Sequence, residues 1–118
     1  MTDNQTKLPV RTCGADSFRR LIGAGLAWLE LNYMIVNQLN VFPVPDGDTG
    51  TNMLLTLRNA YSEIAKKDSD SAGELAATLA NKMIYVARGN SGTILSQLFR
   101  GFASVVHDHA EFDAPLVA

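Results

Sequence analysis

Apolar residues recur every three or four positions along most of this chain, which is the spacing of one face of an α-helix. The first such stripe predicts a long helix over residues 17–38, with Asp16 as its N-cap. Its members, mostly apolar, are Phe18, Leu21, Ile22, Gly25, Leu29, Asn32, Ile35, Val36 and Leu39. We therefore expect this helix to bury one face and to expose the other.

Three further stripes follow, and the first of these ends in Lys66 and Lys67, where cations suit a helix C-terminus. A polar connection over residues 68–72 separates it from the next. The three stripes consist of Met53, Leu57, Ala60, Tyr61 and Ile64; of Leu75, Ala76, Leu79, Ala80, Met83 and Ala87; and of Ile94, Leu95, Leu98, Phe99, Phe102, Val105 and Val106. Residues 41–44 are β-branched in part, but Pro43 and Pro45 remove ladder donors. The predicted fold class is all-α.

Composition narrows the classes of protein to consider. The chain has 118 residues, of which 47% are hydrophobic, so it forms one domain at most and can pack a core. The 12 acidic and 10 basic residues are interleaved, which argues against nucleic acid or anionic lipid as a partner. The single Cys13 excludes an internal disulfide and favours the cytoplasm. The N-terminus is polar, and no apolar run is long enough to cross a bilayer, so secretion and membrane insertion are not predicted.

The end of the chain lacks the helical pattern. After the fourth stripe comes HDHAEFDAPLVA, which has loose apolar residues and no further period, while the four helices carry wide apolar faces. We therefore expect a polar tail over residues 1–16 and an incomplete domain over residues 17–118. Uncovered apolar faces would also favour self-association of the chain.

A short pattern occurs twice at predicted helix starts. The sequence GDTGT occupies residues 47–51 and GNSGT residues 89–93, and an apolar helical stretch follows each. Helix N-termini present unpaired N–H groups and a positive dipole end, glycines allow close approach, and hydroxyls add donors. Both segments suit phosphate, and antiparallel helices could bring them side by side to hold one nucleotide.

Acidic residues precede the first of these segments. Asp46 and Asp48 flank Gly47, and Asn40 stands at the start of the same proline-containing loop, so these three oxygen donors are candidate Mg²⁺ ligands. The alternative is a turn whose aspartate caps the next helix. An EF-hand does not fit, because Thr51 and Leu57 occupy its glycine and glutamate positions, and no Gly-Lys pair marks a P-loop.

Other polar and aromatic residues have less specific interpretations. His107 and His109 near the chain end are expected to be solvated, and Trp28 and Tyr33 are expected to pack. Arg88 precedes GNSG and is open to two roles, contact with phosphate or capping of the preceding helix.

The segments LNVFPVPDGDTGTNM and ARGNSGTILSQLFRGF closely resemble the N-terminal kinase domain of the bacterial fatty acid kinase catalytic subunit. That domain is a branch of the DhaL-like, or dihydroxyacetone kinase nucleotide-binding, family. The resemblance implies an eight-helix barrel, of which this chain would form about half from antiparallel helices. It also implies ATP with two Mg²⁺ ions, metal ligation by Asp46 and Asp48, and a less direct match at Asn40. The implied nucleotide-binding residues are Thr49, Gly50, Thr51, Asn52, Gly89, Asn90, Ser91 and Gly92.

The resemblance further implies the reaction. A kinase of this family transfers a phosphoryl group by positioning and charge neutralisation, so we expect no catalytic acid, base or nucleophile from the chain. In the fatty acid kinase branch the acceptor is a fatty acid carboxylate held by a separate acyl-binding protein. The alternatives are the nucleotide-binding subunit of a dihydroxyacetone kinase and an inactive helical fragment or interaction module.

Overall fold

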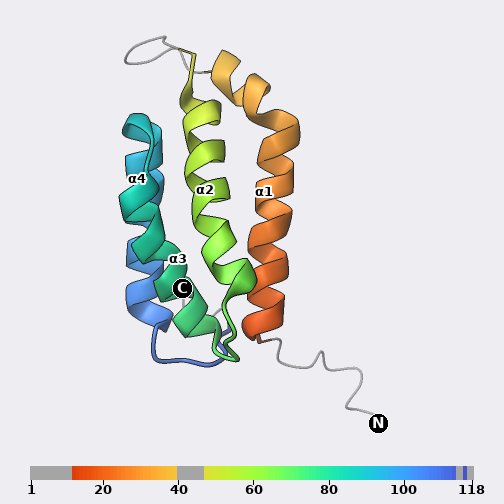
Figure 1. Cartoon of the computed structure of the whole chain (residues 1–118), viewed down its shortest axis with the longest axis vertical. Helices are drawn as coiled ribbons and strands as arrows, with labels where there is room; N and C mark the ends of the chain where they lie inside the picture. The colour runs from red at the N-terminus through yellow and green to blue at the C-terminus, as the bar shows by residue number, and fades with distance from the viewer. Residues whose placement is uncertain (1–11, 40–46, 114–115, 117–118) are drawn as a thin grey trace.

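The computed structural model describes residues 12–39, 47–113 and 116, and these form four α-helices (Figure 1). They are α1 (Ala15–Gln38), α2 (Thr49–Lys66), α3 (Ala72–Val86) and α4 (Gly89–Val106). Within the described ranges the sole β-pairing is an isolated bridge between Cys13 and Phe112. The prediction of an all-α fold is confirmed.

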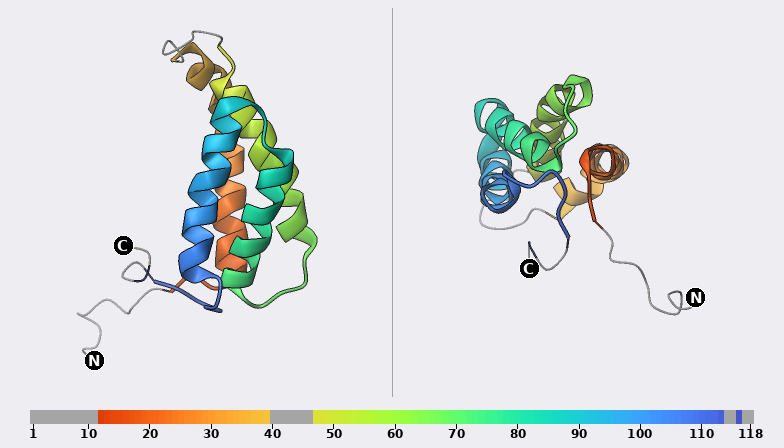
Figure 2. Two further views of the ribbon diagram at one scale, coloured as in Figure 1. Left: turned by 90° about the vertical axis from the view of Figure 1, so that its left-hand side faces the viewer. Right: turned by 90° about the horizontal axis from the view of Figure 1, so that it is seen from below.

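Consecutive helices run in opposite directions, so α2 and α4 both begin at the end of the bundle where α1 and α3 finish (Figures 1 and 2). Helix α1 packs mainly on α2, and α4 packs mainly on α3, while α2 also contacts both α3 and α4. This arrangement places the two glycine-rich helix starts at one end of the molecule.

The start of α1 differs from the sequence prediction. The N-cap is Gly14 rather than Asp16, which lies in the first turn and pairs with Arg19 at 2.9 Å. The chain before the helix is held by Cys13, whose backbone N–H donates to Phe112 O at 2.7 Å and whose carbonyl accepts from Phe112 N at 3.2 Å. Tertiary pairing therefore fixes this helix start, and the Asp16 carboxylate turns to a side chain instead. The first 11 residues of the predicted polar tail lie outside the described residues.

The connection from α2 to α3 is organised by Arg19 and Ser71. Arg19 donates from Nε to Ile64 O at 3.1 Å and from Nη2 to Lys67 O at 2.6 Å, so it satisfies carbonyls at the C-terminus of α2. Ser71 is the N-cap of α3, and its hydroxyl accepts from Glu74 N at 3.1 Å. Helix α3 accordingly starts at Ala72, which the sequence pattern assigned to the connection.

The core runs between the four helices and contains residues from all of the predicted stripes. Its largest fully buried side chains include Phe18, Ile64, Leu75, Leu79, Met83 and Val106. Phe18, Phe102 and Phe112 form an aromatic cluster in which the rings of Phe102 and Phe112 lie 5.4 Å apart, edge to face. Each predicted helix therefore contributes to one continuous core.

Not every apolar residue of the predicted stripes is buried. Ile35 and Leu39 are exposed because the buried residues of α1 end at Leu29. Leu21 precedes Leu29 but is exposed as well, because α1 packs mainly on α2. Trp28, expected to pack, keeps 56% of its surface exposed, and Leu31 keeps 84%. None of the described helices is both long enough and apolar enough to cross a membrane.

Candidate functional site

The two glycine-rich helix starts lie against each other at one end of the bundle. The hydroxyl of Ser91, in the first turn of α4, donates to the carbonyl of Thr49, the first residue of α2, at 3.2 Å. The predicted juxtaposition of the two segments is confirmed. Because α2 and α4 run parallel here, the positive ends of both helix dipoles point to the same region.

Gly89 allows the second segment to lie close to the first. Its φ is +64°, a conformation that L side chains rarely adopt, and a Cβ at this position would collide with the amide of Asn52. The Asn52 side chain therefore lies directly on the backbone of the GNSG turn. Two predicted nucleotide-binding residues from separate segments are in this way brought together.

Thr56 joins α2 to the start of α4 one turn further along. It is fully buried, at 0% exposure, and its Oγ1 accepts from the backbone N–H of Arg88 at 3.0 Å. Gly92 is buried against the same hydroxyl, so a Cβ there would collide with Thr56 Oγ1. Sequence reasoning missed Thr56, although a hydroxyl inside an apolar stripe one turn after a glycine motif was a usable signal.

Asn37, in the last turn of α1, holds the start of α2. Its Nδ2 donates to Thr51 Oγ1 at 2.9 Å, and its Oδ1 accepts from Thr51 N at 3.0 Å. Gly50 is buried beside this pair, and a Cβ on it would collide with the carbonyl oxygen of Tyr33. The sequence stripe gave no sign of this role for Asn37, because the contact partner lies on another helix.

Asp48 and Arg88 occupy the N-cap positions of α2 and α4, and neither side chain caps its helix. The carboxylate of Asp48 is exposed and follows Gly47, which has a φ of +73°. The simple N-cap interpretation of Asp48 is therefore not supported. An exposed carboxylate that does not cap the helix suits one position in a Mg²⁺ ligand set.

The rest of the predicted ligand set cannot be placed in the same way. Asn40 and Asp46 lie outside the described residues. Among the residues that the structure describes, no group of three or more His, Cys, Asp or Glu side chains is arranged to hold a metal ion. Of the three predicted ligands, Asp48 alone is thus located, at the glycine-rich end.

The predicted nucleotide-binding residues divide into two groups by burial. Gly50 and Gly92 are buried and let helices approach each other, whereas Asn90 is exposed and Ser91 is half-buried. His107 and His109 are exposed, as expected, and follow the last turn of α4 at the opposite end of the bundle. The glycine-rich end therefore combines packing glycines with accessible polar groups.

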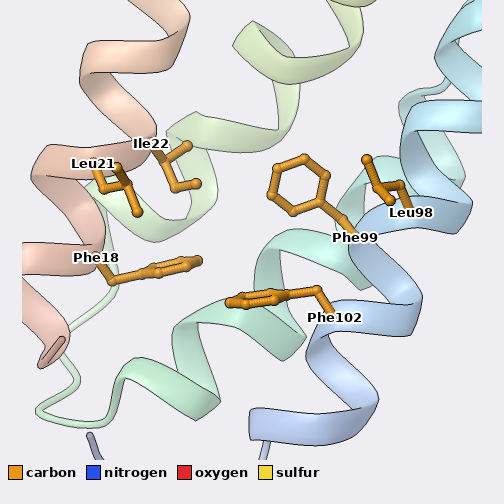
Figure 3. A pocket seen from close by; sticks show the side chains of 6 residues that line it. All are labelled: Phe18, Leu21, Ile22, Leu98, Phe99 and Phe102. Carbon is orange, nitrogen blue, oxygen red and sulfur yellow. The ribbon is translucent and has the colours of Figure 1, made fainter. Parts of the chain in front are cut away.

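A separate cavity of about 310 Å³ lies between α1 and α4 and is entirely apolar (Figure 3). Side chains from the two helices point toward one another across it: Phe18, Leu21, Ile22, Leu98, Phe99 and Phe102. The cavity adjoins the beginning of α1 and the end of α4, and so it lies away from the glycine-rich end. Its lining offers no donor to a phosphate.

Comparison with known proteins identifies the family. The model of the DAK2 domain matches residues 43–118, which include both glycine-rich segments and α2, α3 and α4. The chain belongs to the DAK2 domain family. DAK2 is a domain of the dihydroxyacetone kinase family, and membership of that family supports a kinase-related function.

Two longer bacterial proteins are similar to this chain over most of its length. Protein YloV of Bacillus subtilis (strain 168) is 44% identical over 107 residues, which is 91% of this chain and 19% of YloV. An uncharacterized protein of Staphylococcus aureus (strain USA300) is 46% identical over 101 residues, which is 86% of this chain and 18% of the relative. The chain thus spans about one fifth of the length of these curated relatives.

Proposed function

We propose that this DAK2 domain binds ATP with Mg²⁺ and takes part in phosphoryl transfer to the carboxylate of a fatty acid held by a separate acyl-binding protein. The observation that carries the proposal is the pairing of the two glycine-rich helix starts through Ser91 and Thr49. Family membership supports nucleotide binding, and the resemblance of both segments to fatty acid kinases supports the acceptor. We also assign the reaction to the cytoplasm.

The helix starts supply the chemistry that a polyphosphate needs. Helices α2 and α4 begin at the same end of the bundle (Figure 1), and each dipole stabilises an anion by about 0.3–1 kcal/mol, more where the site is partly buried. Gly89 and the Asn52 amide keep the two starts in contact. Two donors from different helices can in this way hold different phosphates of one nucleotide.

Asp48 would act as a metal ligand beside these donors, and its exposed carboxylate supports this role. In this proposal Asp46 and Asn40 complete the set from the segment before it, and two Mg²⁺ ions are accommodated as in the resembling family. When bound, Mg²⁺ neutralises the charge of the phosphates. Asp48 orients the cation next to the first turn of α2, and no protein acid, base or nucleophile is required.

The acceptor has two candidates. The sequence PVPDGDTGTNM favours a fatty acid carboxylate, whereas the DAK2 family as a whole favours dihydroxyacetone. We favour the fatty acid because the resemblance to that branch extends over both glycine-rich segments.

An acceptor assay separates the two candidates. The protein encoded by the complete reading frame is incubated with ATP, Mg²⁺ and either a fatty-acid-loaded carrier protein or free dihydroxyacetone. We expect ADP and acyl phosphate with the loaded carrier and no ADP above background with dihydroxyacetone. If ADP forms only with dihydroxyacetone, the acceptor is dihydroxyacetone and the fatty acid assignment is wrong. If no ADP forms with either acceptor, the result favours an interaction module.

A further inference from the structure

Asn37 fixes the hydrogen-bonding polarity of the Thr51 side chain. The backbone nitrogen of Thr51 can only donate, so the Asn37 atom 3.0 Å from it must be the amide oxygen. The amide nitrogen of Asn37 is then the atom 2.9 Å from Thr51 Oγ1, and it donates to that oxygen. The amide has one chemically consistent orientation, and in it the Thr51 hydroxyl accepts a hydrogen bond.

A hydroxyl that accepts from Asn37 keeps its own proton for another partner. Thr51 is half-buried in the first turn of α2, two residues after Thr49, at the end where α4 also begins. Its backbone N–H is already used by Asn37 and is not available to a ligand. Thr51 can therefore contribute only its side-chain proton to an anion bound at this end.

Ser91 has the opposite polarity. Its hydroxyl proton is directed to the carbonyl of Thr49 at 3.2 Å, so the Ser91 hydroxyl links the two helix starts. The two hydroxyls of the glycine-rich end are thus not equivalent. The Ser91 hydroxyl donates its proton within the protein, whereas the Thr51 hydroxyl can donate its proton to a ligand. Neither composition nor the glycine pattern distinguishes them.

The contact between Asn37 and Thr51 is also closely packed. Gly50 is buried next to it, and the backbone of Tyr33 leaves no space for a side chain there. The first turn of α2 therefore rests directly on the last turn of α1, and the donor is held in place before any ligand arrives.

We propose that Asn37 is a positioning residue that presents the Thr51 hydroxyl as a hydrogen-bond donor to a phosphate group of Mg²⁺-ATP. This inference rests on the proposed nucleotide-binding function. It adds a residue of α1 to a site that the glycine-rich segments alone define, and it assigns different roles to Thr51 and Ser91.

The substitution Asn37→Asp tests the hydrogen-bonding polarity of the Thr51 hydroxyl, because aspartate has nearly the same shape as asparagine. A carboxylate still accepts from Thr51 N, but it also accepts from the Thr51 hydroxyl and so withdraws the proton from the ligand. Gln38→Glu is the matched control, because it adds the same charge to the neighbouring exposed residue at the end of α1. We expect Mg²⁺-ATP affinity, measured by calorimetry on the complete protein, to fall about tenfold more in Asn37→Asp than in Gln38→Glu.

A double substitution separates positioning from a general structural role. In a Thr51→Val background the hydroxyl is absent, so Asn37→Asp should weaken Mg²⁺-ATP binding no more than Gln38→Glu does. Hydrogen exchange of the Thr51 amide in the ligand-free protein supplies a second measurement, and this amide should stay protected in Asn37→Asp and exchange faster in Asn37→Ala.

Two results would overturn the inference while nucleotide binding stands. One is equal Mg²⁺-ATP affinity of Asn37→Asp and Gln38→Glu, and the other is an undiminished effect of Asn37→Asp in the Thr51→Val background. Failure of the unsubstituted complete protein to bind Mg²⁺-ATP would instead overturn the proposed function and this inference with it.

Discussion

Helix α3 begins very differently from α2 and α4. At the start of α3, Ser71 caps the helix through Glu74 N, Ala72 N donates to Ala110 O at 2.8 Å, and Gly73 N donates to His109 O at 2.8 Å. At the starts of α2 and α4 the N-cap residues are Asp48 and Arg88, and their side chains do not cap. The N–H groups at the start of α3 are thus bonded within the chain, and we call this the sealed start of α3. The glycine-rich starts of α2 and α4 are instead held in position by side chains of other helices.

The contrast concerns how the N–H groups at a helix start are satisfied when the side chain of the N-cap residue does not bond to them. The unpaired N–H groups of a helix must be satisfied by side chains, water or a ligand. In α3 the chain itself satisfies them, through Ala110, His109 and Ser71. In α2 and α4 the contacts of Asn37, Thr56 and Ser91 align the two starts, and the Asp48 carboxylate is left exposed.

Gly50→Ala should have the largest effect on stability at the glycine-rich end. The new Cβ would meet the backbone carbonyl of Tyr33, which cannot move aside, so α1 and α2 must separate. We expect a loss of about 2–3 kcal/mol in the free energy of unfolding, measured by chemical denaturation. Gly25→Ala is the control, because its Cβ meets nothing within 4 Å, and it should stabilise the protein by about 0.5–1 kcal/mol. Equal behaviour of the two variants would show that α1 does not pack closely on this turn.

Arg19→Met should lower stability at the opposite end and leave nucleotide binding unchanged. The change removes the donors to the carbonyls of Ile64, Lys67 and Ser69 while it keeps most of the apolar stem. We expect the free energy of unfolding to fall by about 2 kcal/mol, since hydrogen bonds from a charged donor contribute about 1.5–3 kcal/mol. Arg20→Met, on the exposed face of α1, should change stability by less than about 0.5 kcal/mol. A change in Mg²⁺-ATP affinity in Arg19→Met would contradict the separation of the two ends.

Thr56→Val should weaken the link between α2 and α4 with little change in volume. The Arg88 N–H would lose its acceptor, and we expect a cost of about 1–2 kcal/mol. The same variant should bind Mg²⁺-ATP more weakly, because the start of α4 is no longer fixed against α2. Thr78→Val in α3 makes the same chemical change away from the site and serves as the control. Unchanged binding in Thr56→Val would show that the position of the α4 start does not depend on this hydroxyl.

The smallest predicted effect concerns the sealed start of α3. The hydroxyl of Ser69, aided by the charge of Lys67, lowers the pKa of the Glu74 carboxyl from its ordinary value of 4.5. Because the folded-state pKa is the lower one, this contact stabilises the protein above pH 4.5, and the stabilisation is lost as the pH falls through the folded-state pKa. Ser69→Ala should therefore differ from the unsubstituted protein more at pH 7 than at low pH in thermal melts. A difference independent of pH would remove Glu74 from the explanation.

Hydrophobic spacing was enough to predict four helices, and the core residues Phe18, Leu79 and Val106 fall on the predicted stripes. The same spacing was wrong about burial at Ile35 and Leu39, because it does not tell which part of a long helix meets a neighbour. The predicted N-cap Asp16 was wrong as well, since Cys13 and Phe112 fix that helix start through a contact between distant segments.

The sequence was enough to locate the two glycine-rich segments, because their pattern is local, while the roles of their residues stay predictions. Each glycine segment was recognisable because its glycines and hydroxyls fall within a run of five residues. The structure brings the two segments together. Asn37 and Thr56 were missed because each acts on a backbone group of another helix. The predicted ligands Asn40 and Asp46 lie outside the described residues, and they stay predictions.

Calorimetry with Asp48→Ala is the most direct test that the glycine-rich end binds Mg²⁺-ATP. The complete protein should give a saturable binding isotherm that requires Mg²⁺, and Asp48→Ala should give no measurable binding while its far-UV helical signal persists. Asp70→Ala, an exposed aspartate just before the start of α3, should bind Mg²⁺-ATP as the unsubstituted protein does. Equal affinity of Asp48→Ala and the unsubstituted protein would contradict the assignment of the metal and nucleotide site to this end of the bundle.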